Sequence, residues 1–346
     1  MNATTSHFER EIREQADVLR GCLSDDALPR IGATLRADDP TIILTFARGS
    51  SDNAVTFFTY LAGMHLGRPV ASVPPSLATL YQAPLRPDHA LVIGVSQSGE
   101  SQDVVNAVQT LAGTGARTLA IANQPGSSLE RASDLAITLG AGEELAVAAS
   151  KTFTSQMMML ARVVAEWADD DALRSALTMV PDALDALLAN TSAIDAAAMK
   201  LTHAEQLDVL GRGLAFGPAH EIALKLKETS YLHAHAYSSA EFHHGPIASL
   251  GAGDPVLLLG LDDASIEPTR ETAVRLRDTG AQLTIMSSDA ALLDHASTRI
   301  PIPPAPAVVQ AFLHVVAGQW LALRLATERG LDPDAPRHLR KVTQTR

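Results

Sequence analysis

Cysteine is almost absent from this sequence of 346 residues, which contains Cys22 alone. A single cysteine excludes an internal disulfide and any cysteine-rich metal site. Aromatic residues make up only 4% of the chain, and no run of eighteen apolar residues predicts a membrane span. The N-terminus has neither a basic segment nor an apolar one, so we expect no signal peptide. These absences favour a cytoplasmic protein with no membrane partner.

Positive charge is also scarce. Lys and Arg number 27 against 39 Asp and Glu, which gives a formal net charge of −12. This acidic balance disfavours nucleic-acid binding, because DNA and RNA are themselves polyanions. The hydrophobic share of 46% and the charged share of 19% are typical of globular proteins. At roughly 100–200 residues per domain, the length predicts two domains.

The chain contains an internal repeat. Residues 91–124 and 256–289 both run from an apolar segment through a polar turn and an amphipathic helix to Thr-Gly-Ala and a second apolar segment. Buried apolar runs that alternate with helical patterns are typical of parallel strands in βαβ order. The expected strands are 42–46, 91–95, 117–122 and 135–139 in the first copy, and 207–210, 256–260, 283–286 and 299–302 in the second. We therefore predict an α/β protein with two doubly wound parallel sheets.

This repeat divides the chain into five expected parts. Residues 1–34 form an N-terminal helical segment, with an amphipathic helix over 5–24. The first α/β domain covers 35–170, an Ala- and Leu-rich helical connection covers 171–200, and the second α/β domain covers 201–336 and ends in a long helix near 307–329. The tail, 337–346, carries four basic residues and no acid. It is either a solvated tail or a segment that closes over an anionic ligand.

The two copies differ in their polar turns. The first copy has Ser96-Gln97-Ser98-Gly99-Glu100-Ser101, whereas the second has Asp262 and Asp263 at the same place. Such turns lie at the carboxyl ends of strands, where open α/β sheets bind ligands. Hydroxyls, a glycine and backbone N–H groups at a helix start suit an anion, and two carboxylates repel one. Ser50-Ser51 follows the 42–46 strand at the same edge, which favours a phosphate site over simple helix caps.

The most polar stretch is 221–246. Glu221, Lys225 and Glu228 share one helix face, which is either a salt-bridged surface or the setting of a general base. His233, His235, His243 and His244 lack the spacing of a zinc site, so we expect no metal. A histidine before Gly-Pro suits proton transfer to a sugar oxygen. Gly211–Gly217 lacks the spacing of a dinucleotide site, so we expect no cofactor.

Six ordered motifs carry a family resemblance, which runs from about residue 40 to the end. They are 48–51, 96–101, 147–154, 221–237, 241–246 and 336–341. In these residues the sequence resembles the sugar isomerase (SIS) domain proteins. It is most similar to the isomerase half of glucosamine-6-phosphate synthase and to the stand-alone glucosamine-6-phosphate deaminases. The resemblance implies two tandem, flavodoxin-like SIS domains.

The resemblance also implies roles for particular residues. Glu228 would move the proton between C1 and C2, His244 would open the sugar ring from the neighbouring subunit of a homodimer, and Lys341 would form a Schiff base with the ketose. The implied phosphate ligands are Ser50, Ser51, Ser96, Gln97, Ser98 and Ser101. The residues implied to position the sugar are Val147, Ala149, Glu221 and Lys225.

Several residues depart from the family pattern. Arg48 replaces a cysteine and Ala149 replaces a serine. The family synthase carries a glutaminase domain with an N-terminal cysteine. Here residue 2 is Asn, and the segment before the first α/β domain has no room for such a domain. We therefore expect no use of glutamine nitrogen. We therefore predict deamination of an amino-sugar 6-phosphate such as glucosamine 6-phosphate. The alternatives are aldose–ketose isomerisation, deglycation of an amine-modified hexose phosphate, and a non-catalytic phosphosugar sensor.

Overall fold

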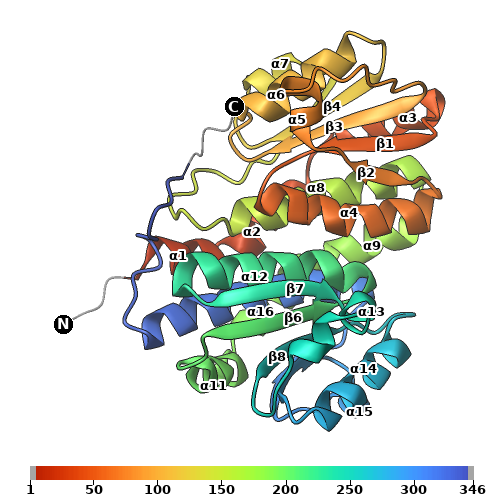
Figure 1. The fold of residues 1–346 in the computed structure, drawn as a ribbon. Coiled ribbons are helices and arrows are strands. Elements are labelled where there is room, and N and C mark those ends of the chain that lie inside the picture. The colour runs from red at the N-terminus through yellow and green to blue at the C-terminus, as the bar shows by residue number, and fades with distance from the viewer. Residues whose placement is uncertain (1–4, 342–346) are drawn as a thin grey trace. The chain divides into compact units, whose positions relative to one another are not determined.

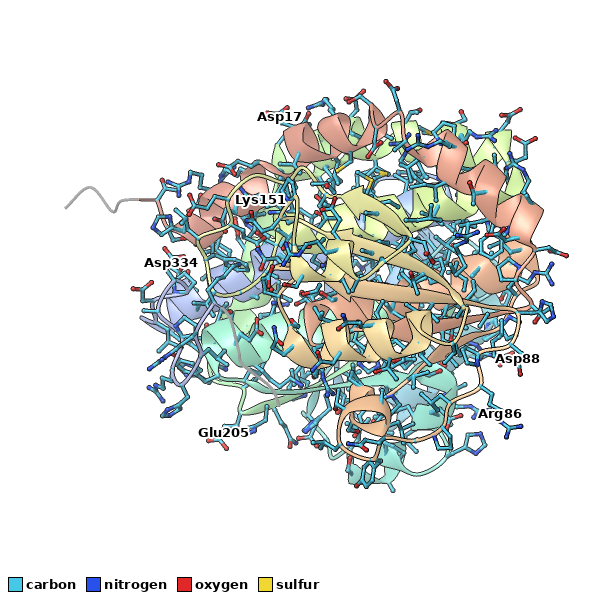
Figure 2. All side chains as sticks on the ribbon, turned by 90° about the horizontal axis from the view of Figure 1, so that it is seen from above. Asp17, Arg86, Asp88, Lys151, Glu205 and Asp334 are labelled. Atoms are coloured by element: carbon cyan, nitrogen blue, oxygen red, sulfur yellow. The ribbon has the colours of Figure 1, made fainter. Side chains whose placement is uncertain are left out.

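The computed structural model describes residues 5–341, which form two α/β units with a five-stranded parallel sheet each (Figure 1). The β1–β5 unit contains Asp17–Glu144, Lys151–Thr178 and the tail from Leu339. The β6–β10 unit contains the chain up to Ala16, Leu145–Ser150 and Met179–His338. The chain therefore changes unit several times, for example at Asp17 and at Lys151, both labelled in Figure 2.

The sheet of the β1–β5 unit has the strand order β2-β1-β3-β4-β5. Its strands are β1 (Ile42–Phe46), β2 (Val70–Ser72), β3 (Ala90–Ser96), β4 (Arg117–Ala122) and β5 (Leu135–Thr138). All four strands expected here are confirmed. β3 is buried along its whole length because strands flank it on both sides. The additional strand, β2, has three residues and only partial burial, too short for a recognisable apolar run.

Helices cover the β1–β5 sheet. They are α2 (Gln15–Leu23), α3 (Leu28–Asp38), α4 (Ser50–Leu66), α5 (Pro75–Thr79), α6 (Gln102–Ala112), α7 (Ser128–Arg131), α8 (Lys151–Ala168) and α9 (Asp171–Thr178). The buried helix α8 packs against both α3 and α4. At Gly32 of α3 an added Cβ would lie 2.6 Å from the Glu166 backbone, so glycine allows the close approach of α3 to α8.

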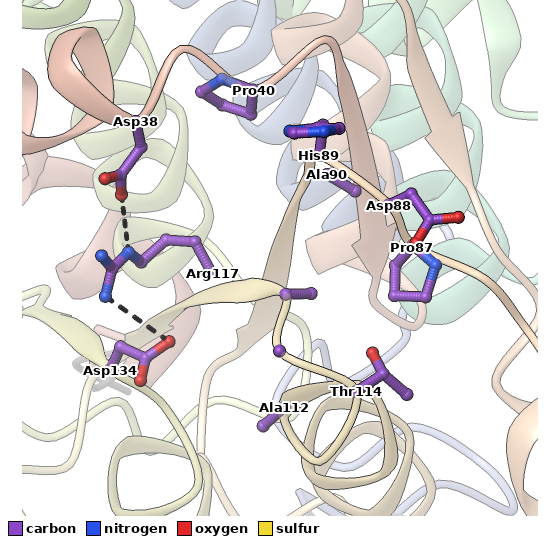
Figure 3. A pocket seen from close by; sticks show the side chains of 12 residues that line it. Asp38, Pro40, Pro87, Asp88, His89, Ala90, Ala112, Thr114, Arg117 and Asp134 are labelled. Carbon is purple, nitrogen blue, oxygen red and sulfur yellow. Dashed lines mark hydrogen bonds and ion pairs between the residues drawn. The ribbon is translucent and has the colours of Figure 1, made fainter.

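A hollow of about 540 Å³ opens at the amino ends of the strands of this sheet. Arg117, the first residue of β4, lies in it between two carboxylates (Figure 3). Its Nε is 2.7 Å from Asp38 Oδ2, and its Nη1 is 4.0 Å from Asp134 Oδ2. The hydrogen bond to Asp38 raises the pKa of Arg117. The guanidinium is thus already neutralised by protein carboxylates.

The sheet of the β6–β10 unit has the order β10-β9-β8-β6-β7, which is the same topology as the first sheet. Its strands are β6 (Gln206–Gly211), β7 (His233–Ser238), β8 (Pro255–Gly260), β9 (Gln282–Ser287) and β10 (Thr298–Pro301). The predicted repeat and the α/β class with two doubly wound sheets are therefore confirmed. The sequence did not reveal β7, because this edge strand alternates histidine with alanine and lacks an apolar run.

The helices of the β6–β10 unit surround a central apolar one. They are α1 (His7–Arg13), α10 (Val180–Leu188), α11 (Ser192–Leu201), α12 (Phe216–Ser230), α13 (Ser239–Phe242), α14 (Ile266–Asp278), α15 (Ala290–Leu293) and α16 (Ala307–Glu328), with 3₁₀ turns at Gly213–Ala215 and Pro246–Ser249. Helix α16 packs against α1, α10, α11 and α12. It is long and apolar enough to cross a membrane, but 94% of its most apolar window is buried, as expected for a core helix.

Two helical predictions differ in detail from the structure. The expected helix over 5–24 is interrupted at Glu14, and its two parts, α1 and α2, fall largely into different units. The helical connection over 171–200 is confirmed as helical but consists of α9, α10 and α11. Pro181 in the first turn of α10 explains one interruption, since proline favours a helix start and disrupts a helix interior. The five domain limits stay predictions.

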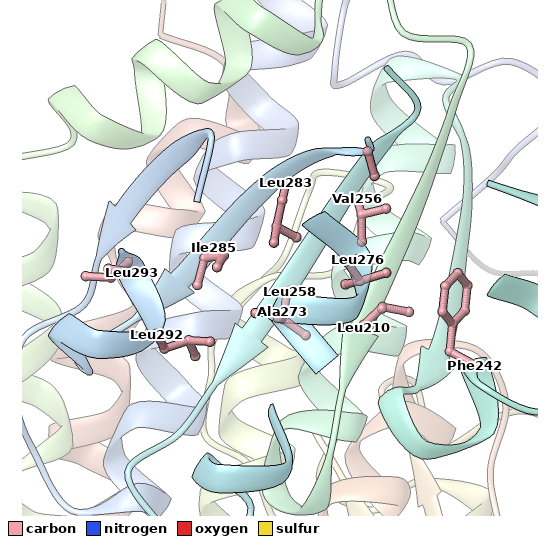
Figure 4. Packing of buried hydrophobic residues seen from close by; sticks show 11 residues of the cluster. Leu210, Phe242, Val256, Leu258, Ala273, Leu276, Leu283, Ile285, Leu292 and Leu293 are labelled. Atoms are coloured by element: carbon pink, nitrogen blue, oxygen red, sulfur yellow. The ribbon is translucent and has the colours of Figure 1, made fainter. Parts of the chain in front are cut away.

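Equivalent apolar clusters lie on the two sheets. In the β6–β10 unit, side chains of β6, β8 and β9 and of α14 interlock around Leu258, Leu276 and Ile285 (Figure 4). In the β1–β5 unit the corresponding cluster joins β1, β3 and β4 to α6 through Val92, Val108 and Ala120. Each unit therefore has its own hydrophobic core, which fixes the loops at the ends of its strands.

Candidate functional site

The serine-rich turns lie at one edge of the β1–β5 sheet. Strands β1 and β3 are parallel neighbours, with Phe46 opposite Gly94, so their carboxyl ends lie side by side. Ser50 and Ser51 begin α4 just after β1, and residues 96–101 join β3 to α6. The strand order reverses between β1 and β3, and such a switch point is where open α/β sheets bind ligands. The hollow of Figure 3 lies at the opposite edge of the sheet.

The turn from Ser96 to Ser101 folds back on its own hydroxyls. Ser96 Oγ lies 3.2 Å from Ser101 Oγ and accepts from the Gly99 N–H, also at 3.2 Å. Ser98 Oγ accepts from the Glu100 N–H at 3.2 Å. Gly99 has φ +65°, and an added Cβ would overlap the Ser127 side chain. Only glycine fits, and the result is a compact loop of hydroxyls at the start of α6.

A hydrogen-bonded carboxylate and an ion pair brace this turn. Glu100 accepts hydrogen bonds from the N–H and the hydroxyl of Ser128, at 2.9 and 2.7 Å, which lower the pKa of the Glu100 carboxyl. Arg48, which precedes Gly49 and the serine pair, donates from Nε to Asp103 Oδ2 at 2.8 Å. The Asp103 side chain is buried, whereas that of Arg48 is 51% exposed. The β1–α4 loop and the start of α6 are therefore tied together beside a guanidinium.

Lys341 also belongs to the β1–β5 unit. Its Nζ lies 2.7 Å from Glu144 Oε2, and the Glu144 side chain is fully buried. The same carboxylate accepts from the Thr152 N–H at 3.0 Å and from its hydroxyl at 2.7 Å. The sequence did not reveal Glu144 as an anchor, although its place beyond β5 at the carboxyl edge was a usable signal. Residues 342–346 of the predicted tail lie outside the described residues.

Glu221, Lys225 and Glu228 lie together on α12 in the β6–β10 unit. Lys225 Nζ is 2.5 Å from Glu228 Oε2 and 3.3 Å from Glu221 Oε1. The side chains of Lys225 and Glu221 are 1% and 0% exposed, and that of Glu228 is 19% exposed. A solvated salt-bridged face is therefore excluded. The buried pair instead fixes Glu228, the member of the group that solvent and ligands can reach.

His244 lies in the turn after α13 and is exposed. Its neighbour His243 places Nε2 3.1 Å from Thr272 Oγ1, which attaches this turn to α14. Partial burial and the nearby Arg275 lower the pKa of His243. His233 and His235 lie on the edge strand β7. Within residues 5–341, no group of three or more His, Cys, Asp or Glu side chains is arranged to hold a metal ion.

Val147 and Ala149 lie in the loop before α8, in the part assigned to the β6–β10 unit. The buried Glu11 carboxylate accepts hydrogen bonds from the N–H groups of Leu145 and Ala146, which fixes the start of this loop. The predicted site residues thus fall into two sets. The six phosphate-site residues and Lys341 belong to the β1–β5 unit, and the other predicted residues belong to the β6–β10 unit.

The equivalent turn of the second copy carries its own anion. Asp263 Oδ1 accepts from the Ser265 N–H at 2.7 Å and from its hydroxyl at 2.5 Å. The Asp262 N–H donates to Gln310 Oε1 at 3.1 Å. In an anion site, such N–H and hydroxyl donors face the ligand. Here the donors of Ser265 bind the Asp263 carboxylate instead, and the negative charge of Asp263 would repel a phosphate.

Sequence comparison relates the chain to curated aminotransferases. A glutamine–fructose-6-phosphate aminotransferase (isomerizing) of Aquifex aeolicus is 34% identical over 345 residues, which cover 97% of this chain and 57% of that protein. An enzyme of the same name from Aeropyrum pernix is 33% identical, with the same coverage. The chain therefore spans a little more than half the length of these relatives.

Structural comparison finds similar chains over nearly the whole length. A Silicibacter pomeroyi protein, named provisionally as a phosphosugar isomerase, has a TM-score of 0.86 and 36% identity, and covers 95% of this chain and 100% of that one. The C-terminal domain of the Francisella tularensis glucosamine-fructose-6-phosphate aminotransferase has a TM-score of 0.87 and 26% identity, with coverages of 97% and 99%. The SIS domain family model matches residues 37–165 and 200–329. This chain belongs to the SIS domain family.

Proposed function

We propose that this protein is an amino-sugar phosphate deaminase that converts glucosamine 6-phosphate and water into fructose 6-phosphate and ammonia. The observation that carries the proposal is the arrangement of Glu228. Its carboxylate is partly exposed, and its Oε2 lies 2.5 Å from the Nζ of the buried Lys225. A general base must be accessible to substrate and fixed in place, and Glu228 meets both requirements.

The proposed reaction consists of ring opening, tautomerisation and one hydrolysis. His244 transfers a proton to the ring oxygen while the O1 hydroxyl loses its proton, and the sugar opens to the aldehyde. Glu228 then moves the proton from C2 to C1, while O1 gains a proton and the amine loses one, which turns the open-chain amino aldehyde into an imine of the ketose. Water adds to the imine carbon, and ammonia leaves with the nitrogen. In this proposal Lys341 contacts the ketose end, and His244 comes from the second subunit of a homodimer.

Phosphate anchoring supports this assignment. The hydroxyls of Ser50, Ser51, Ser96, Ser98 and Ser101, together with Gln97, gather at two neighbouring loops beside Arg48. Binding energy from a remote phosphate can be used to hold the reacting end of a sugar, C1 and C2, in place. The named relatives act on fructose 6-phosphate and transfer an amino group, which agrees with a phosphorylated amino sugar as substrate.

Aldose–ketose isomerisation is the second candidate. The Silicibacter pomeroyi chain of 36% identity is named for that class of reaction, and Glu228 serves it equally well. An isomerase acts on hexose phosphates that lack an amine, so the two candidates differ in substrate. Release of ammonia distinguishes them.

The test uses purified full-length protein with glucosamine 6-phosphate, and follows ammonia and fructose 6-phosphate together. We expect equal amounts of both products. Glu228→Gln should abolish release while phosphosugar binding is retained, and the exposed neighbour Lys227→Gln should leave both unchanged. Full activity of Glu228→Gln would contradict the proposal. Conversion of glucose 6-phosphate to the ketose phosphate would favour the isomerase. Formation of glucosamine 6-phosphate and glutamate from fructose 6-phosphate and glutamine would favour an aminotransferase.

A further inference from the structure

A buried glutamine lies behind one of the phosphate-site serines. Gln156 on α8 is 1% exposed, and its Nε2 donates to Ser51 Oγ at 3.0 Å. Ser51, in the first turn of α4, is itself only 7% exposed. Gln156 Oε1 is also buried, and it has no hydrogen-bond partner among residues 5–341. Among residues 5–341, the Gln156 side chain is therefore linked by hydrogen bonding to Ser51.

This hydrogen bond determines what the serine can do. A hydroxyl has one proton to donate and two lone pairs that accept. Because Ser51 Oγ accepts from Gln156, its proton does not point toward the amide. In the structure the Gln156 Nε2 group faces Ser51 Oγ, and Oε1 points away from it.

A phosphate monoester offers oxygen acceptors, so it binds hydroxyls that donate. We propose that Gln156 is a positioning residue that commits the Ser51 hydroxyl to donating toward a phosphate oxygen of the ligand. The inference rests on the phosphate site of the proposed function. It makes Gln156 a determinant of affinity for a phosphorylated sugar, although its own amide is buried behind Ser51 and contacts the ligand through that serine.

Packing alone is the competing explanation, because the side chain of Gln156 extends from α8 to Ser51 of α4, and these two helices pack together. A double-mutant cycle separates the two explanations, since it measures whether two residues act through each other. The proteins are the full-length chain, Gln156→Met, Ser51→Ala and the double variant. The probe is an open-chain hexitol 6-phosphate, which cannot be enolised, and its affinity is measured by calorimetry.

We expect Gln156→Met to weaken binding by about threefold to tenfold, the range for one lost hydrogen bond. In the Ser51→Ala background the same change should have no further effect. Ser155→Ala is the matched control: this fully buried neighbour donates to the Lys151 carbonyl at 2.8 Å, so its loss should not change affinity. Equal weakening with and without Ser51, or weakening by Ser155→Ala to the same degree, would overturn the inference.

A second variant guards against misfolding. Gln156→Glu keeps the size of the side chain. At a pH at which the new carboxyl is ionised it offers only acceptors, so Ser51 must donate inward. We expect a larger loss of affinity than for Gln156→Met, with an unchanged far-ultraviolet spectrum, and undiminished affinity would overturn the inference. Binding of the hexitol phosphate without ammonia release from glucosamine 6-phosphate would contradict the proposed function alone. Absence of hexitol phosphate binding to the unmodified protein would contradict both.

Discussion

Replacement of Lys225 by Met should destabilise the β6–β10 unit severely. The Lys225 ammonium lies 3.3 Å from Glu221 and 2.5 Å from Glu228, and the side chains of Lys225 and Glu221 are almost entirely removed from solvent. Methionine fills most of the space of the lysine stem but has no charge. Glu228, at 19% exposure, can still be hydrated. The Glu221 carboxylate would remain in the interior without this cation.

The magnitude follows from that burial. Removal of one partner from a buried ion pair costs ~3–5 kcal/mol, because the remaining charge has lost its compensation. A domain is stable by only ~5–15 kcal/mol, so this loss is a large fraction of the total. Removal of both charges in Glu221→Leu with Lys225→Met should recover most of the loss, since replacement of a buried pair by apolar residues is often neutral.

Urea unfolding at pH 7 measures the effect, with circular dichroism and tryptophan fluorescence as two probes. Both tryptophans are informative, because Trp320 lies in the β6–β10 unit and Trp167 in the β1–β5 unit. Lys227→Met, on the same helix but exposed, is the matched control and should stay within about 0.5 kcal/mol of the unmodified protein. A loss for Lys225→Met no larger than that of the control, or no recovery in the double variant, would refute the reasoning.

Three further predictions concern the β1–β5 unit. Burial raises the pKa of the Cys22 thiol from 9.0 to about 11; the unfolded thiol ionises first, so the stability contribution is complete below pH 9 and is lost as the pH rises to 11. The free energy of unfolding should therefore decrease between pH 9 and pH 11 by ~2–3 kcal/mol less in Cys22→Ser than in the unmodified protein. An equal decrease in the two proteins would contradict this. Gly99→Ala should weaken hexitol 6-phosphate binding by about tenfold or more, because the new methyl group overlaps Ser127; Gly63→Ala, with open space around it, is the control in the same titration. Arg48→Met should lower that affinity and flatten its dependence on salt concentration, since it removes a cation beside the serine turns; the exposed Arg30→Met should do neither, and equal salt slopes for Arg48→Met and the unmodified protein would argue against a role in anion binding.

The sequence was informative where a feature is local. Eight strands could be predicted because each is a continuous apolar run, and the serine turns stand out by their density of hydroxyls. Strand β7 could not, since its stability depends on pairing with β6 rather than on its own histidines and alanines. Glu144 and Gln156 are single polar residues whose partners, Lys341 and Ser51, lie 197 and 105 positions away. Such contacts depend on the tertiary fold, and no periodicity reveals them.

The packing of helix α1 limits when the β6–β10 unit can fold during synthesis. The helix is made long before α16 but packs on it: the Arg13 guanidinium lies 4.5 Å over the Trp320 ring, and Gln15 Nε2 donates to Gln319 at 2.8 Å. The His7 and Phe8 N–H groups bond to the Asp334 carboxylate. During synthesis on the ribosome, the apolar face of α1 therefore stays uncovered until α16 has been made. An expression fragment cut after residue 170 would retain that face without its partner and would be prone to aggregation, whereas a fragment starting after α1 would leave α16 uncovered.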